Sequence, residues 1–106
     1  MAQVYAVIFR AEIKMLDDAY SEMASKMRNL AVLKYGCIEF TAVTEGTQEI
    51  AISYWNNPED IQRWKKDSEH LIAQELGQSS WYHSYKVQIV EIKREYASKS
   101  WCRVTL

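Results

Sequence analysis

The sequence predicts a single α+β domain of the ferredoxin-like class, with an antiparallel sheet and two helices on one face of that sheet. Its 106 residues are close to the usual size of one domain. Two stretches with helical periodicity alternate with four stretches rich in β-branched and aromatic residues, in the order β-α-β-β-α-β. This is the order of the split βαβ arrangement. We therefore expect one domain over residues 1–96 and a tail over residues 97–106.

The first half of the chain contains a predicted strand followed by a predicted helix. Residues 3–12 are rich in β-branched and aromatic side chains, which favours a strand. Residues 15–34 predict an amphipathic helix, because their apolar side chains recur on one face. That face holds Met15, Leu16, Ala19, Met23, Met27, Leu30 and Leu33. Gly36 follows, and glycine suits the left-handed conformation that ends many helices.

The second half contains a predicted hairpin, a second helix and a last strand. Residues 37–45 and 48–55 are the two strands of the hairpin, and a turn at Gly46 joins them. An asparagine cap followed by Pro58 predicts the start of the helix. Gly77 ends the helix, whose apolar face holds Ile61, Trp64, Ser68, Leu71 and Ile72. Residues 81–95 are the last predicted strand.

The predicted strands are apolar on both faces, which a half-exposed sheet does not need. The first strand places Tyr5, Val7 and Phe9 on one face, with Ala6 and Ile8 on the other. Two helices can cover only one face, so we expect a homodimer that forms through the open sheet face, with the tail packing across the interface. The alternative is a monomer whose tail folds back over that face.

Composition and charge exclude several classes of function. Thirteen basic against 14 acidic residues give a net charge of −1, so nucleic acid is not an expected partner. Cys37 and Cys102 lie far apart without a C-x-x-C pair, so neither a zinc site nor a disulfide framework is predicted. No stretch has the length of a membrane span or the pattern of a signal peptide. We expect a soluble cytoplasmic protein with no membrane partner.

Two segments resemble the antibiotic biosynthesis monooxygenase family. They are SYWNNPEDIQRWKKDSEHLIAQ over 53–74 and WYHSYKVQIVEIKREY over 81–96. The resemblance implies a dimeric α+β barrel with a pocket between sheet and helices in each subunit. Some members of the family are cofactor-free monooxygenases that oxidise aromatic polyketides. Other members bind and degrade haem, bind small molecules, or have no assigned activity.

The resemblance carries over to this chain only in part. Trp55 matches a tryptophan near the pocket of the polyketide-oxidising members, but Ala51 stands where those members have an asparagine. Trp64 matches the tryptophan of the haem-degrading triad. Gln74 stands where that triad has its histidine, and Phe9 is the nearest match to its asparagine. Two of the three haem-site residues therefore differ, which argues against haem degradation by that route.

His70 and His83 are the candidate catalytic bases, because histidine titrates near neutral pH. His70 lies away from the apolar face of its helix, so a surface role competes with a pocket role. His83 follows Trp81 and Tyr82 and could face the cavity, although a structural role competes here too. No three or four ligands converge in the pattern of a metal site.

The function implied by the resemblance is oxidation of a small aromatic molecule without a cofactor. The substrate itself would lose a proton and react with oxygen in a dry, aromatic-lined cavity. No glycine-rich nucleotide motif is present, and no cofactor is predicted. The alternatives are a binding protein without turnover and a haem-binding or haem-degrading protein. The expected substrate-binding residues are Trp55, Trp64, Trp81, Tyr82, Phe9 and Gln74.

Overall fold

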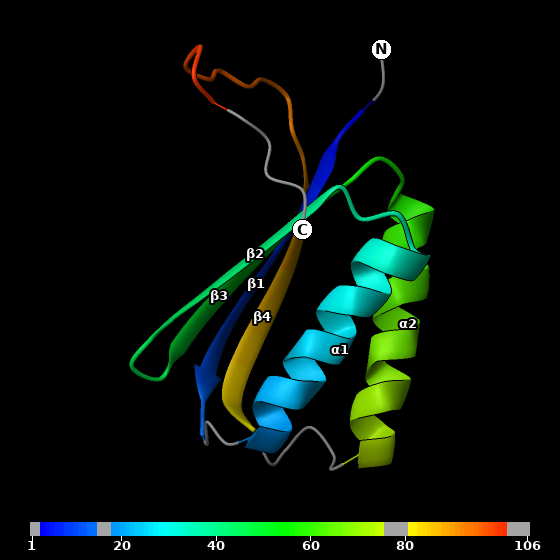
Figure 1. Ribbon diagram of the computed structural model, residues 1–106, viewed down its shortest axis with the longest axis vertical. Helices are drawn as coiled ribbons and strands as arrows, with labels where there is room; N and C mark the ends of the chain where they lie inside the picture. The colour runs from blue at the N-terminus through cyan, green and yellow to red at the C-terminus, as the bar shows by residue number, and fades with distance from the viewer. Residues whose placement is uncertain (1–2, 15–17, 76–80, 102–106) are drawn as a thin grey trace.

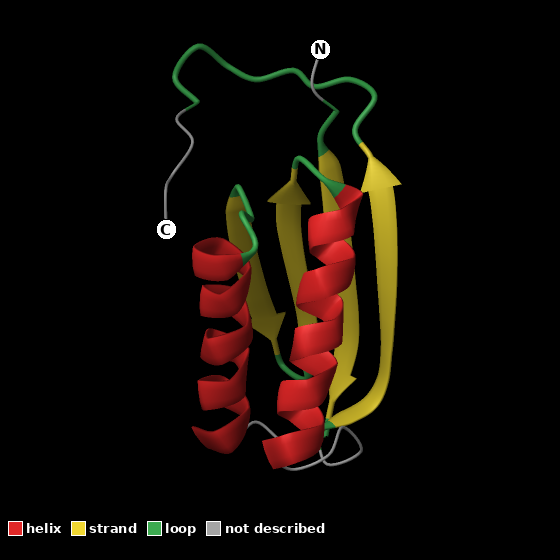
Figure 2. Ribbon diagram, turned by 90° about the vertical axis from the view of Figure 1, so that its right-hand side faces the viewer, coloured by secondary structure: helices red, strands yellow, loops and turns green. Residues whose placement is uncertain are grey.

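Four antiparallel strands form one sheet, and both helices cover the same face of it (Figures 1 and 2). The computed structural model describes residues 3–14, 18–75 and 81–101, with the side chains of 70–75 outside this description. The elements are β1 (Tyr5–Ile13), α1 (Asp18–Lys34), β2 (Glu39–Glu45), β3 (Gln48–Trp55), α2 (Pro58–Glu75) and β4 (Tyr82–Glu91). The strand order is β2-β3-β1-β4. The ferredoxin-like prediction is therefore confirmed.

The ends of the elements lie where the local chemistry places them. Gly36 has a φ of 75° after α1, and the Cys37 amide donates to the Ala31 carbonyl beside it. Gly46 has a φ of 61° in the hairpin turn. Asn57 caps α2, because its side-chain oxygen accepts a hydrogen bond of 2.9 Å from the Glu59 amide. The predicted helix start at 15 and the predicted stop at Gly77 fall outside the described residues.

The pairing register decides which side chains face the helices. Val7 of β1 lies opposite Ser53 of β3 and Ile89 of β4. Residues directly opposite each other on antiparallel strands share a face of the sheet. Phe9, two residues further along β1, lies on the same inner face, opposite Ala51 and Val87.

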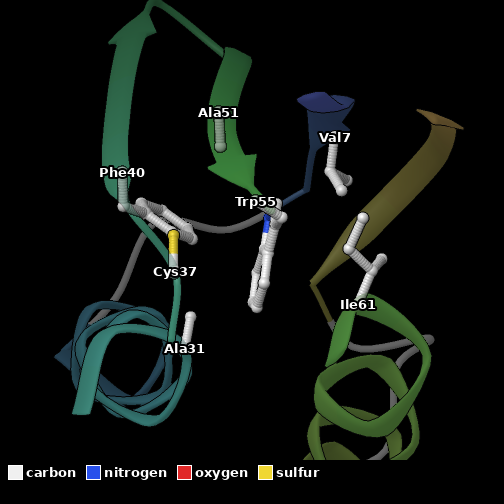
Figure 3. Close-up of a cluster of buried hydrophobic side chains, with 7 residues drawn as sticks. All are labelled: Val7, Ala31, Cys37, Phe40, Ala51, Trp55 and Ile61. Carbon is white, nitrogen blue, oxygen red and sulfur yellow. The ribbon is translucent and has the colours of Figure 1, made fainter. Parts of the chain in front are cut away.

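Two clusters of buried side chains hold the helices on the sheet. The larger cluster contains Val7, Ala31, Cys37, Phe40, Ala51, Trp55 and Ile61. Figure 3 shows Trp55 pointing from the end of β3 between Ala31 of α1 and Ile61 of α2. The second cluster contains Ile13, Tyr20, Met23 and Trp81. Burial of these apolar side chains attaches the helices to the sheet.

The outer face of the sheet carries apolar side chains that no described residue covers. Val43 is 62% exposed, Ile50 38% and Val90 40%. The described residues after β4, 92–101, extend past the end of the sheet and do not fold over this face (Figure 1). None of the described helices is long and apolar enough to span a bilayer.

Candidate functional site

A cavity of about 240 Å³ lies between the inner face of the sheet and the two helices. Its wall combines side chains of all four strands with side chains of both helices. Aromatic residues supply much of this wall, and they are Phe9, Tyr20, Phe40, Trp64, Tyr82 and Tyr85. A concave, mostly apolar space with few polar groups is the usual form of a site for a small molecule.

The cavity exists because small side chains occupy the middle of the inner face. Ala42 of β2 lies opposite Ala51 of β3, and Ser53 follows on the same side of β3. These three side chains line the cavity and leave space above the sheet. Trp64 of α2 spans this space and stands next to Trp55, with 5.3 Å between ring centroids. The large side chains of the two core clusters hold the helices away from the sheet, and the small side chains between them leave the space unfilled.

Trp64 also links helix α2 to helix α1 on the helix side of the cavity. Its indole nitrogen donates a hydrogen bond of 2.9 Å to the backbone carbonyl of Met27 in α1. Its ring meets the Phe40 ring edge to face, with 6.0 Å between centroids. The indole is therefore fixed on two sides while it lines the cavity, which makes it a rigid wall for a planar ligand.

A carboxylate and two phenols form one polar part of the wall. The helices and β3 also bring polar residues to it, namely Ser25, Arg28, Ser53, Lys65, Ser68 and Glu69. Glu49 of β3 lies on the inner face, and the Tyr20 hydroxyl of α1 donates to its Oε1. Burial and this hydrogen bond raise the pKa of Tyr20 well above the usual range of a phenol. Burial also raises the pKa of Tyr82 to about 12, so both phenols stay protonated near neutral pH.

Ser68 of α2 brings a buried hydroxyl to the cavity wall. The side chain is 8% exposed and lines the cavity, yet among the described residues its hydroxyl has no hydrogen-bond partner. Buried polar groups in folded proteins are nearly always paired, so an unpaired hydroxyl calls for an explanation. A ligand in the cavity would supply the missing partner.

A β-bulge decides which side chains of β4 face the cavity. The register of β1 and β4 shifts between Glu12, opposite Ser84, and Ile13, opposite Tyr82. His83 is therefore the extra residue without a partner on β1. The shift turns both Tyr82 and Tyr85 toward the cavity, although three positions separate them in the sequence.

The structure brings three of the predicted site residues together. Phe9, Trp64 and Tyr82 line the cavity, and the rings of Phe9 and Tyr82 meet edge to face with 5.6 Å between centroids. Trp55 and Trp81 are fully buried in the two clusters and do not belong to the cavity wall.

Of the two histidines and Gln74, the structure describes the side chain of His83 alone. His83 is exposed and does not line the cavity. The side chains of His70 and Gln74 lie outside the described residues. Within the described residues, no group of three histidine, cysteine or acidic side chains could hold a metal ion.

Sequence reasoning missed the polar residues Glu49, Tyr20 and Ser68. Glu49 precedes Ala51 by two positions and therefore shares its face, so strand alternation could have pointed to it. Helical periodicity places Ser68 on the apolar face of its helix, which agrees with its position in the cavity wall. Nothing in the sequence indicated that Tyr20 would meet Glu49, because 29 positions separate them.

Comparison with known proteins gives one relative in sequence and several in structure. The chain is 36% identical over 92 residues to the uncharacterized protein YqjZ of Bacillus subtilis, and the match covers 86% of this chain and 81% of YqjZ. No family model matches the chain.

The similar solved structures share the fold at low sequence identity. An asparagine-to-alanine mutant of SnoaB, a cofactor-independent oxygenase from Streptomyces nogalater, superposes with a TM-score of 0.72 at 10% identity, covering 92% of this chain and 100% of that one. The NE2512 protein of unknown function from Nitrosomonas europaea gives 0.70 at 14% identity, covering 93% and 98%. A candidate antibiotic biosynthesis monooxygenase from Nitrosomonas europaea gives 0.64 at 15% identity, covering 85% and 90%.

Proposed function

Because the chain belongs to the family of YqjZ and has the fold of the antibiotic biosynthesis monooxygenases, we propose that it is a cofactor-independent monooxygenase for a small aromatic molecule. One structural neighbour, SnoaB, is itself described as a cofactor-independent oxygenase. A shared fold hosts several chemistries, so the proposal rests on the cavity as well.

The observation that carries the proposal is the aromatic cavity with its few polar groups. Its volume of about 240 Å³ lies just below the usual range of ligand pockets, roughly 300 to 1,000 Å³, and suits one compact planar molecule. Trp64 and Phe9 offer flat surfaces to an aromatic ring. Tyr85, Val87 and Ile89 of β4 line the cavity and are also exposed to solvent, so this side offers an entrance.

The reaction requires no electron donor other than the substrate. An anthrone-type ring CH₂ group loses a proton, and the resulting carbanion reduces O₂ and forms a carbon–oxygen bond. Loss of water from the hydroperoxide leaves a carbonyl, so CH₂ and O₂ become C=O and H₂O. The wall excludes water, and its hydrogen-bond donors stabilise the negative oxygen of the enolate.

Oxygen uptake with a panel of anthrone-type phenols tests the function. The wild-type protein should consume oxygen in saturable fashion, and Trp64→Phe should lower kcat/KM by about tenfold, because the ring loses its anchor on Met27. Trp101→Phe is the matched control, because Trp101 is 68% exposed in the tail.

Phenol binding and haem absorption, measured on the same purified protein, distinguish the two alternative functions. Saturable phenol binding without oxygen uptake would replace the monooxygenase with a binding protein. A haem absorption band that decays with reductant would replace it with the haem-degrading function that Gln74 and Phe9 argue against.

We also propose that the protein is a homodimer joined through the outer face of the sheet. Ile8 of β1 and Ile52 of β3 lie opposite each other at the centre of this face, and Val43, Ile50 and Val90 extend it. A second copy would cover these side chains in the manner of two packed sheets. The exposed tail around Trp101 is available to pack on that second copy.

Ile52→Glu should convert this dimer to a monomer, because two unpaired carboxylates would be buried at its centre. Light scattering after gel filtration measures the mass directly. Gln62→Glu, on the exposed surface of α2, is the control and should stay dimeric. A wild-type protein with the mass of one chain would contradict the proposal.

The location we propose is the cytoplasm. Cys37 is a buried free cysteine, and burial raises the pKa of its thiol, which keeps it in the unreactive form. Such a thiol fits a reducing compartment. Recovery of the protein from a secreted fraction of cells would contradict this location.

A further inference from the structure

Glu49 is the acidic side chain that the sheet contributes to the cavity wall, whereas Arg28, Lys65 and Glu69 line the cavity from the helices. It is half-buried on the inner face, opposite Ala11 of β1 and Thr44 of β2. The Tyr20 hydroxyl occupies its Oε1, and among the described residues no group donates to Oε2. One carboxylate oxygen is therefore fixed in place, and the other is free to accept a hydrogen bond from a ligand.

The neighbours of Glu49 cannot take a proton themselves. Tyr20 and Tyr82 are neutral phenols near pH 7, since burial raises the pKa of both hydroxyls. The rings of the two tyrosines meet edge to face with 5.9 Å between centroids. Around this end of the cavity the phenols therefore act as donors, and the carboxylate is the acceptor.

Ser68 supplies a second polar contact from the helix side. Its hydroxyl is buried and unpaired among the described residues, and Glu49 stands on the opposing layer, the sheet. An unpaired buried hydroxyl lowers stability, so its position is understandable if a ligand pairs with it. A ligand that pairs with both groups needs a donor for the Glu49 carboxylate and a second polar atom for the Ser68 hydroxyl, and the aromatic wall favours a ring system between them.

We infer that Glu49 is the general base of this cavity and that Ser68 binds a second oxygen of the ligand. The ligand class is then a small, neutral aromatic molecule with an ionisable hydroxyl or enol and a second oxygen that accepts a hydrogen bond. The base role rests on the proposed monooxygenase function, whereas the recognition of such ligands does not.

The reaction returns Glu49 to its starting state. Glu49 takes the proton from the substrate, and the electron pair of the broken bond stays on the substrate as an enolate. The enolate reduces O₂, the new carbon–oxygen bond forms, and the proton returns to the peroxide. Water then leaves as the carbonyl forms, and Glu49 is again a carboxylate.

Binding of para-nitrophenol tests the recognition, because this probe has one ionisable hydroxyl and an accepting nitro group. The wild-type protein should bind the neutral phenol at least about tenfold more tightly than the phenolate, since the carboxylate repels a second negative charge. Glu49→Gln keeps an acceptor for Tyr20 but should reduce this preference to less than about threefold. Glu45→Gln, an exposed position at the end of β2, should retain the wild-type preference.

Ser68→Ala should change ligand affinity and protein stability in opposite directions. Affinity for para-nitrophenol should fall about five- to tenfold, because a neutral hydrogen bond is lost. The melting temperature of the free protein should rise by roughly 4 °C, because the unpaired hydroxyl is removed. Ser21→Ala, exposed on α1, should change neither quantity. A serine with a purely structural role would give lower stability and unchanged affinity, which would overturn the assignment of Ser68.

Turnover of a dihydroxyanthrone tests the base. Glu49→Gln should lower kcat by about 100-fold or more with KM little changed, as expected when a general base is removed. A kcat within about threefold of wild type would overturn the base role. Wild-type binding that shows the expected dependence on Glu49 and Ser68 without oxygen uptake would refute the monooxygenase function and the base role, while supporting the ligand class. A wild-type protein that does not bind para-nitrophenol would overturn the ligand class.

Discussion

Trp55→Ala is expected to lower the free energy of unfolding by about 4 kcal/mol, the range observed when a large buried aromatic side chain is deleted. Trp55 is fully buried, packs against Trp64, and lies between both helices and the sheet. Its indole nitrogen also donates a hydrogen bond of 2.8 Å to the Ser53 hydroxyl. The substitution therefore leaves a cavity in the larger core cluster and a buried serine without its donor.

Urea unfolding followed by circular dichroism measures this loss. Domains of this size have a total free energy of unfolding of only about 5 to 15 kcal/mol, so Trp55→Ala removes a large part of the stability of the folded protein. Leu33→Ala is the control and should change the stability by less than about 0.5 kcal/mol, because the Leu33 side chain on α1 is 83% exposed. A loss below about 1.5 kcal/mol for Trp55→Ala would show that the core does not depend on this residue.

The order of elements could be predicted because each boundary has a local chemical cause. Strand β3 ends at Trp55, as predicted, because the asparagine cap and Pro58 start a helix directly after it. Gly36 and Gly46 end α1 and turn the hairpin through their positive φ angles. Each of these signals acts within a few residues, so the sequence alone is enough to read it.

The candidate site could be predicted in part. Trp64 was expected from the apolar face of its helix and from the family resemblance, and Phe9 was expected from the resemblance alone. Both residues line the cavity. Trp55 and Trp81 belong to the same aromatic set but fill the core. Residue type alone does not tell whether an aromatic side chain lines the cavity or fills the core. The neighbours of each side chain in three dimensions decide this.

The polar end of the cavity depends on contacts that the sequence does not reveal. The bulge at His83 reverses the alternation at the start of β4, so Tyr82 faces the cavity where a regular strand would have turned it outward. The pairing of Tyr20 with Glu49 joins a helix to a strand across the core. Both features arise from tertiary packing and not from local propensity.

We expect the ligand to bind in the cavity between the sheet and the helices. A substitution at Ala51 tests this location directly. Ala51 lies on the inner face of β3 between Glu49 and Ser53, and its side chain lines the cavity. A larger side chain at this position would occupy the ligand volume. Because the cavity has room for the added methyl groups, we expect Ala51→Leu to keep its melting temperature within about 5 °C of wild type.

The decisive measurement is the affinity of Ala51→Leu for para-nitrophenol and dihydroxyanthrone, with Ala51→Ser as a control of similar volume. We expect Ala51→Leu to bind both compounds at least about 30-fold more weakly than wild type and to lose oxygen uptake in parallel. The serine variant should stay within about threefold of wild type. Unchanged affinity and oxygen uptake in a folded Ala51→Leu protein would show that the ligand binds elsewhere and would contradict the expected location.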